Sequence, residues 1–112
     1  MAVRAVAKNV GISPRKMRRV LDIVRGKPVK AALEILDFLP TPAAREVAKV
    51  VRSAASNAEN NNMMALDELR IVEIHADAGV VLHRSRARSR GRTGRITKRT
   101  SHITVLVDEE ES

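Results

Sequence analysis

The chain has 112 residues, enough for one small domain with a single modest hydrophobic core. It carries 21 Lys and Arg against 13 Asp and Glu, and this net charge of +8 is typical of small nucleic-acid-binding domains. There is no Cys, which excludes disulfides and thiolate metal sites, and there is no apolar run of the roughly 18 residues that a membrane-spanning helix needs. We therefore expect one cytoplasmic domain, residues 1–112, without a signal peptide.

Two segments carry all of the positive excess. Residues 4–30 hold nine Lys or Arg and one acid, and residues 83–102 hold eight bases and no acid. The intervening residues 31–82 are net acidic, with eight acids and four bases. Four acids also lie in the tail at 108–112, which we expect to be exposed and disordered. The two basic segments are therefore the expected anion-binding surfaces.

The first basic segment predicts a strand followed by a helix. Val3 to Val10 alternate approximately between apolar and polar residues, as in a strand. Ser13 then suits an N-cap and Pro14 the first helical position, while Gly26 suits the position just after a helix end. Between them, apolar residues recur with the spacing of one helix face: Met17, Val20, Leu21 and Val24.

Two further helices are predicted in the acidic segment. Pro28 can open a short one, with Ala32, Leu33, Leu36 and Leu39 as its apolar contacts. Thr41 can cap the next helix, with Pro42 at its first position. This third helix has the clearest periodicity in the chain, and its change from Val to Ala predicts close packing toward its end: Val47, Val50, Val51, Ala54, Ala55 and Ala58.

From Leu69 the apolar period changes to two, which predicts strands. The residues expected on one face of the first strand are Val72, Ile74, Ala76, Ala78, Val80 and Leu82. A second alternating run near the C-terminus contains Ile103, Val105 and Val107.

Between these runs, arginine alternates with small residues at Arg84, Arg86, Arg88, Arg90 and Arg92. An extended chain places all five on one side, and such a segment has nothing to bury. We therefore expect a long β-hairpin at about 79–102 that projects roughly 35 Å from the domain. Arginine suits phosphate contacts because its planar guanidinium is weakly hydrated and bidentate. The alternative is a flexible basic arm with non-specific roles.

RNA contact is a hypothesis for two further groups of polar residues. The basic residues of the first helix are Arg15, Lys16, Arg18 and Arg19, although such a face can also be merely solvated. The asparagine cluster at 57–62 can end a helix or hydrogen-bond ribose and phosphate.

Phe38 is the only aromatic residue, so base stacking on aromatic rings is excluded, and recognition must use phosphates, 2′-hydroxyls and shape.

No catalytic or metal site is predicted. His75, His83 and His102 show no ligand spacing, and Ser101 and His102 point apart if they are neighbours in a strand. A DNA-binding helix-turn-helix regulator and an RNA-acting enzyme are the competing hypotheses. The first does not need an arginine hairpin of this length, and the second lacks an acid–base pair, a nucleophile or a metal cluster. No cofactor is expected.

Several motifs together resemble a known family. They are Ser13-Pro14-Arg15-Lys16-Met17-Arg18, Arg25-Gly26-Lys27, Ser53-Ala54-Ala55-Ser56-Asn57-Ala58-Glu59-Asn60-Asn61 and Lys98-Arg99-Thr100-Ser101-His102-Ile103-Thr104-Val105, with the run Arg86 to Arg92 before the last. From about Val3 to Val107 the chain resembles bacterial large-subunit ribosomal protein twenty-two. It departs from that family at Ala87, where Pro is common, and at Arg86, where an apolar residue is frequent.

The resemblance implies an α+β fold, with three helices packed on a small antiparallel sheet and a long protruding β-hairpin. It implies a structural constituent of the large ribosomal subunit that binds and bridges large-subunit (23S) rRNA and aids its assembly. The hairpin tip, Arg88, Ser89, Arg90, Gly91 and Arg92, would line the polypeptide exit tunnel. The implied partners are this rRNA, neighbouring ribosomal proteins and the nascent polypeptide, with no membrane and no small-molecule substrate.

Combining the residues with the resemblance gives one set of expected rRNA-binding residues. It comprises Arg15, Lys16, Arg18, Arg19, Lys27, Asn57, Asn60, Asn61, Arg84, Arg86, Arg88, Arg90, Arg92, Arg95, Lys98, Arg99, Thr100, Ser101 and His102.

Overall fold

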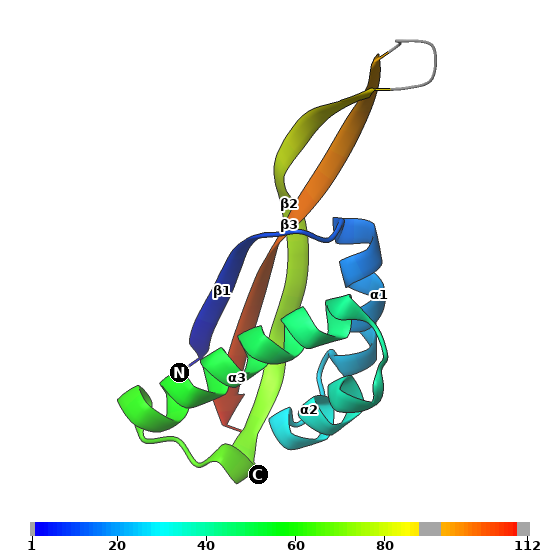
Figure 1. Cartoon of the computed structure of the whole chain (residues 1–112). Coiled ribbons are helices and arrows are strands. Elements are labelled where there is room, and N and C mark those ends of the chain that lie inside the picture. Colours follow the sequence, from blue (N-terminus) through cyan, green and yellow to red (C-terminus); the bar gives the residue numbers. More distant parts are fainter. Residues whose placement is uncertain (1, 88–92, 110–112) are drawn as a thin grey trace.

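A computed structural model of the chain describes residues 2–87 and 93–109, and the side chains within these ranges except at 82–97. Three helices lie on one face of an antiparallel three-stranded sheet of order β1-β3-β2 (Figure 1). This is the α+β fold that the resemblance implies. The elements are β1 (Val3–Val10), α1 (Pro14–Val24), α2 (Val29–Phe38), α3 (Pro42–Asn62), the short 3-10 helix η1 (Leu66–Glu68), β2 (Leu69–Ala87) and β3 (Thr93–Glu109).

The helix boundaries follow local chain chemistry. α1 begins at Pro14 and ends before Gly26, whose φ of 77° is the left-handed conformation that glycine adopts without strain. α3 begins at Pro42, and the Thr41 hydroxyl accepts a 3.2 Å hydrogen bond from the backbone N–H of Ala44. The predicted cap at Thr41 is therefore confirmed.

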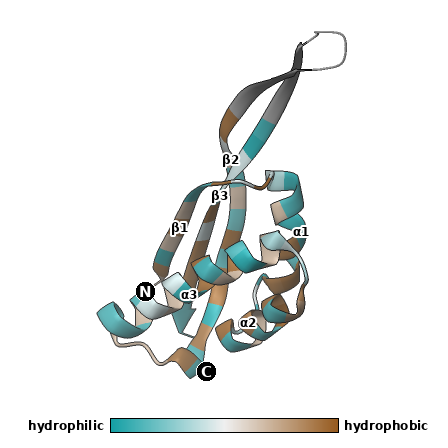
Figure 2. Ribbon diagram, viewed as in Figure 1, coloured by the Kyte–Doolittle hydropathy of each residue, from teal (hydrophilic) through white to brown (hydrophobic). Residues whose placement is uncertain are grey.

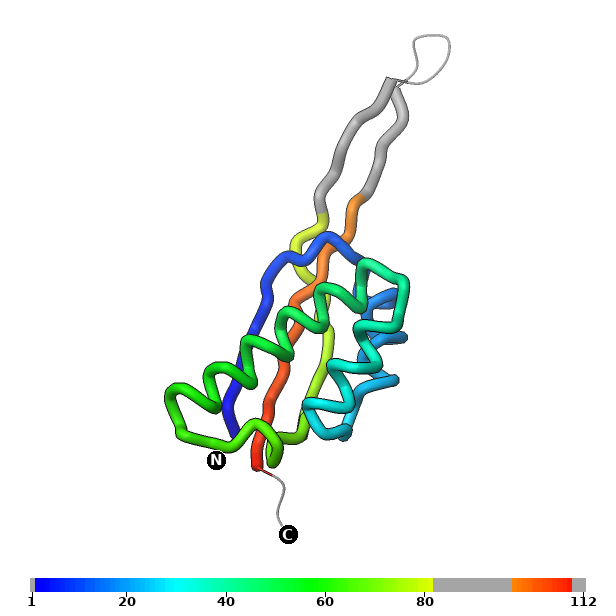
Figure 3. Tube along the Cα trace, turned by 60° about the horizontal axis from the view of Figure 1, so that its bottom comes forward, coloured from blue at the N-terminus to red at the C-terminus, as the bar shows by residue number. Residues whose placement is uncertain are grey.

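The core lies between the helices and the sheet. The predicted apolar faces of α1 and α3 are buried as expected, from Met17 to Val24 and from Val47 to Ala58. α3 crosses the sheet over β1 and β3, while α1 and α2 lie toward β2 (Figure 3). Hydrophobic segments occur along all three strands where the helices cover the sheet (Figure 2). The helices and the sheet therefore bury one common apolar layer.

The alternation predicted for β2 is only partly right. Ile74 and Ala76 are buried as expected, but Val72 is 42% and Val80 is 55% exposed. The reason is irregular pairing with β3, whose register shifts between Ile71 and Glu73 and again between Ala78 and Val81. Each bulge changes which side chains face the helices, and a strictly alternating pattern cannot follow such a shift.

β2 and β3 form the expected hairpin. They pair from Leu69 opposite Glu109 to Ala87 opposite Thr93, whereas β1 pairs with β3 only as far as Ser101. On the N-terminal side of Ser101, β3 therefore pairs only with β2, and the two strands project from the body as an arm (Figure 1). The expected tip, Arg88 to Arg92, lies outside the described residues.

The acidic tail begins later than expected. Asp108 and Glu109 are the last two residues of β3, where they pair with Arg70 and Leu69. The expectation of disorder from residue 108 is therefore wrong for these two residues, because β2 offers them a hydrogen-bonding neighbour. Residues 110–112 lie outside the described part of the chain.

Candidate nucleic-acid interface

A groove of about 660 Å³ lies where the arm joins the body. Three segments line it: the turn from β1 into α1, the first residues of α3, and β3 just beyond its last pairing with β1. The lining residues are Gly11, Ile12, Ser13, Lys16, Arg19, Val20, Thr41, Pro42, Ala43, Lys98 and Arg99.

Cations from both basic segments meet in this groove. Lys16 and Arg19 come from α1, and Lys98 and Arg99 come from β3. All four are exposed, no carboxylate lines the groove, and none of the four forms an ion pair with another described residue. The groove therefore gathers positive charge that no described carboxylate neutralises.

Some cations elsewhere on the body differ in this respect. On α3, Arg52 lies 3.1 Å from a carboxylate oxygen of Asp37, and Lys49 lies 3.6 Å from one of Glu46. These two cations already have carboxylate partners, so they suit comparison with the groove cations.

Two helix N-termini add to the positive potential of the groove. α1 begins beside it at Pro14 and α3 at Pro42. The unpaired N–H groups of a first helical turn carry partial positive charge, which favours anions. At α1 the Ser13 side chain makes no capping hydrogen bond, so it does not compete for these donors. The groove therefore suits a phosphate-bearing ligand.

The floor of the groove is aliphatic. Val20 and Ala43 are only 7% and 6% exposed because they also belong to the core, Ile12 is half-buried, and Pro42 lines the groove as an exposed residue. Phe38 is 88% exposed at the end of α2 and is not among the lining residues. Any ligand of the groove therefore meets cations at the rim and aliphatic carbon at the floor.

Hydrogen bonds fix the root of the arm. The Ser101 hydroxyl donates to the carbonyl of Ile12 at 2.5 Å, and the Thr100 hydroxyl donates to the carbonyl of Val80 at 2.6 Å. The backbone N–H of Asn9 donates to Nδ1 of His102 at 3.0 Å. These contacts tie β3 to β1, to the turn after β1 and to β2, so several hydrogen bonds hold the side of the groove next to the arm.

Two of the predicted RNA contacts at residues 100–102 have side chains that face the protein interior. Ser101 is fully buried and Thr100 is 7% exposed, and both hydroxyls donate hydrogen bonds within the protein. The apolar alternation of the strand already indicated that Ser101 is buried. Ser101 has the same alternation as Ile103, Val105 and Val107, which places it on the face of the strand that the helices cover.

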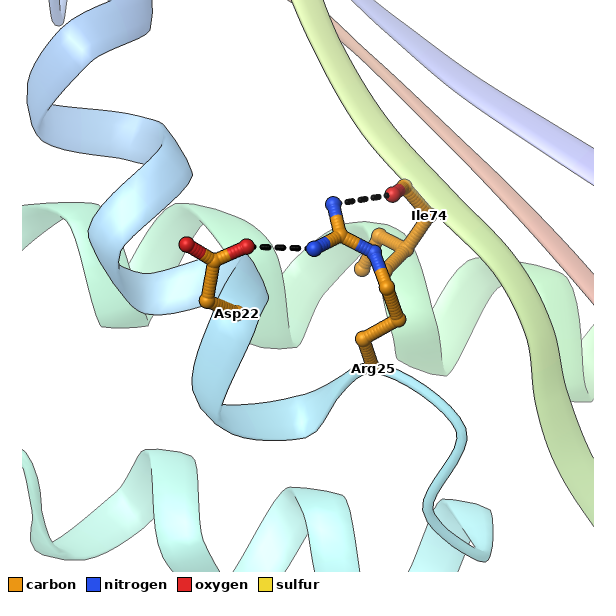
Figure 4. Close-up of polar contacts among 3 residues, drawn as sticks. All are labelled: Asp22, Arg25 and Ile74. Atoms are coloured by element: carbon orange, nitrogen blue, oxygen red, sulfur yellow. Dashed lines mark hydrogen bonds and ion pairs between the residues drawn. The ribbon is translucent and has the colours of Figure 1, made fainter.

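Two arginines of the first basic segment bond to the outer edge of β2. Nη2 of Arg18 donates to the carbonyl of Ala76 at 3.1 Å, and Nη2 of Arg25 donates to the carbonyl of Ile74 at 2.9 Å. Arg25 also pairs with Asp22 (Figure 4). The structure therefore gives Arg18, a predicted RNA contact, a bond within the protein. No pattern in the sequence indicates this bond.

The other predicted residues of the body, whose side chains the structure describes, do not line the groove. Arg15 and Lys27 are exposed. Asn60 and Asn61 are exposed and Asn57 half-buried near the far end of α3, roughly 27 Å along its axis from Pro42. The backbones of Arg84, Arg86 and Arg95 lie in the arm, whereas Arg88, Arg90 and Arg92 lie outside the described residues.

Within the described ranges, no group of three or more His, Asp or Glu side chains could hold a metal ion. No helix in the same part of the chain is long and apolar enough to span a bilayer.

Comparisons with known proteins agree with the resemblance. Residues 5–108 match the family model described as ribosomal protein L22p/L17e. The chain is 54% identical over 111 residues to the large ribosomal subunit protein uL22 of Roseiflexus sp. (strain RS-1), covering 99% of this chain and 98% of that protein. It is 50% identical to the uL22 of Herpetosiphon aurantiacus, with the same coverage. The uL22 of Desulfatibacillum aliphaticivorans is 50% identical over 109 residues, or 97% of this chain and 100% of that protein.

Proposed function

Because this chain belongs to the ribosomal protein L22p/L17e family, we propose that it acts in the large ribosomal subunit by binding and bridging large-subunit (23S) rRNA. Membership of this family makes the chain a structural constituent of the cytoplasmic large subunit and not an enzyme. Its RNA contacts would then lie where cations without carboxylate partners gather on its surface.

The observation that supports RNA binding best is the convergence of Lys16, Arg19, Lys98 and Arg99 in one groove. Residues 4–30 and 83–102 are far apart in the sequence, but folding brings their cations together at the root of the arm. Each phosphate that a cation neutralises releases a condensed counterion, which favours binding at low salt. A surface of this kind binds the RNA backbone without reading its sequence.

Bridging follows from the shape of the molecule. The groove belongs to the body, whereas the second basic segment continues along the arm, away from the helices (Figure 1). A cationic surface on the body and another on a projecting hairpin can neutralise phosphates of two separate RNA segments. Holding such segments together would aid assembly of the subunit.

The arm would also reach the polypeptide exit tunnel. In this proposal residues 88–92 line the tunnel wall, next to the nascent polypeptide, while the body contacts neighbouring ribosomal proteins. The arginines of the arm would neutralise the rRNA that surrounds it. Replacing Arg88, Arg90 and Arg92 together with Gln should then weaken rRNA binding or subunit assembly.

A salt titration tests RNA binding directly. The full chain is titrated with 23S rRNA over a series of salt concentrations, and a variant with Lys16, Arg19, Lys98 and Arg99 replaced by Gln is compared with it. Each lost phosphate contact should lower the slope of log affinity against log salt by about 0.7–0.9. The matched control replaces Lys49 and Arg52, which already have carboxylate partners, and should keep the original slope. Equal slopes for all three proteins would reject the groove as an RNA contact.

Crosslinking in a cell lysate tests the identity of the RNA. The RNA recovered with the protein should be large-subunit rRNA. Recovery of mainly duplex DNA, or preferential binding of duplex DNA in competition with 23S rRNA, would instead support the regulator hypothesis.

A further inference from the structure

We propose that the groove at the root of the arm binds one unstacked nucleotide of a bulged or single-stranded RNA segment. This inference rests on the proposed function, because it requires that the chain binds RNA. It goes further by stating which form of RNA the groove takes and which part of the nucleotide meets each surface.

The size and lining of the groove fit such a ligand. Its volume of about 660 Å³ lies within the range of about 300–1,000 Å³ that small-molecule pockets of proteins occupy. Ile12, Val20 and Ala43 give it an aliphatic floor, and the exposed Pro42 adds apolar surface to its lining. A base that has left its stack exposes apolar faces to water, and covering them on this floor is favourable. Because no aromatic side chain lines the groove, this contact would be aliphatic packing without ring stacking.

The rim supplies the complementary charge. Lys16 and Arg19 line the groove from α1, and Lys98 and Arg99 line it from β3. A nucleotide within a chain has a phosphate on each side of its sugar, so cations from two elements can neutralise both phosphates. Charge on two sides with carbon between them matches a nucleotide better than it matches an isolated anion.

Two hydroxyl groups in the lining can contact the sugar or the base edge. Ser13 makes no capping hydrogen bond through its side chain. The Thr41 hydroxyl accepts from the backbone N–H of Ala44, which leaves its own proton available for donation. Both residues line the groove. A ribose 2′-hydroxyl both donates and accepts, so it can bond either group, and this contact would favour RNA over DNA.

A continuous RNA duplex fits the same groove less well. Its phosphates lie on the outside and its bases stay stacked within, so it offers no apolar surface to the floor. A duplex would contact the cationic rim only. An RNA with an unpaired, splayed base therefore gains a contact that a fully paired RNA of equal charge lacks.

The experiment compares two synthetic RNA duplexes that differ by one nucleotide, and therefore by one phosphate. One is fully paired, and the other replaces one base pair by a single bulged nucleotide carrying the fluorescent base 2-aminopurine. Both are titrated with the full chain at one fixed salt concentration, and binding is followed by anisotropy. We expect the bulged RNA to bind about tenfold more tightly, equal to about 1.4 kcal/mol. We also expect its fluorescence to change on binding.

Gly11 offers a variant that adds bulk to the lining of the groove without changing its charge. It lines the groove, and a Cβ added there would meet no heavy atom within 4 Å. Its φ lies outside the left-handed range, so a larger residue introduces no backbone strain. With Gly11→Leu the preference for bulged over paired RNA should fall from about tenfold to about onefold. The control Ser56→Leu adds the same side chain on the exposed side of α3 and should keep the tenfold ratio.

A second measurement does not depend on any variant. The wild-type chain is crosslinked to the same RNA with 4-thiouridine at the bulge, and the modified peptides are identified by mass spectrometry. Crosslinks at the segments that line the groove, residues 11–20, 41–43 or 98–99, support the inference. Crosslinks confined to other parts of the chain overturn it.

The outcomes separate this inference from the proposed function. Equal affinity for the two RNAs, together with normal salt-dependent binding to 23S rRNA, overturns the nucleotide site alone. Failure to bind 23S rRNA overturns both. In purified large subunits, crosslinks from the groove to a neighbouring protein and not to rRNA would show that an acidic protein segment occupies the groove, which also overturns the nucleotide site.

Discussion

Nη2 of Arg18 donates a 3.1 Å hydrogen bond to the carbonyl oxygen of Ala76, which joins the basic face of α1 to the outer edge of β2. Arg25 makes the same kind of bond to Ile74, and the backbone N–H of Ile71 donates to the carbonyl of Lys27. Since β2 is an edge strand, its outer carbonyl and N–H groups would otherwise face solvent or another strand. The first helix and the residues just after it therefore protect a sheet edge, and one of them, Arg18, was predicted to contact RNA.

Replacing Arg18 by Ala should consequently affect stability, whereas replacing Arg19 by Ala should affect RNA binding. Arg18→Ala should lower the free energy of unfolding by about 1 kcal/mol, because the strand loses a charged hydrogen-bond donor. Arg19→Ala should leave the free energy of unfolding nearly unchanged and should reduce the salt dependence of RNA binding instead. Urea denaturation and RNA titration of both variants test the difference. Equal loss of stability in the two would contradict the edge-capping role.

Gly79 is expected to tolerate no side chain. A Cβ added there would lie 2.6 Å from Oγ1 of Thr100 and 3.2 Å from Oδ1 of Asn9. Gly79→Ala should therefore destabilise the protein by about 1–3 kcal/mol, because the hydrogen bonds at the root of the arm must shift. Gly11→Ala meets no atom within 4 Å and should be neutral or stabilising by about 0.4–1 kcal/mol. Thermal denaturation compares the two, and a harmless Gly79→Ala would mean that the root is not tightly packed.

Ser101 should matter for stability in spite of its small size. Its buried hydroxyl donates to the carbonyl of Ile12, and Ser101→Ala leaves that carbonyl without this donor. The expected cost is about 1–3 kcal/mol of unfolding free energy. Ser53→Ala, on the exposed side of α3, should change stability little, because Ala is a good helix former. If both substitutions prove neutral in urea denaturation, the Ser101 bond adds no net stability.

The alanine half of α3 should not accept larger residues. Ala58 is fully buried where the helix packs over β1 and β3. Ala58→Leu should cost about 1–3 kcal/mol through overpacking, whereas Ser56→Leu on the exposed side should cost little. Denaturation midpoints of the two variants check this, and a neutral Ala58→Leu would show a loosely packed helix–sheet contact.

Much of this architecture was predictable, because local chemistry and tertiary packing agree. Thr41 and Pro42 start α3 as predicted, Gly26 follows the end of α1, and the apolar stripe from Val47 to Ala58 is buried throughout. In each case residues close together in the sequence determine where the helix begins, where it ends or which face is buried. The fold of three helices on a small antiparallel sheet and the family were also predicted correctly.

The remainder depended on contacts between distant segments. The bulge at Val72 reflects the register of β2 against β3, which alternation within β2 does not encode. The edge bond of Arg18 requires α1 to lie beside β2, and the groove requires the first and second basic segments to meet. Charge counting indicated that these segments bind an anion. It could not indicate which of their residues form hydrogen bonds within the protein.

The central position of β3 has a consequence for folding on the ribosome. β1 and β2 both hydrogen-bond to β3, and Val3 pairs with Val107. During synthesis the helices can begin to form locally, but their apolar faces lack a complete sheet until residues 101–107 have emerged. Such a high contact order favours slow folding and leaves hydrophobic surface uncovered in the growing polypeptide. The sheet can therefore be completed only late in synthesis, when β3 has emerged and can pair with β1.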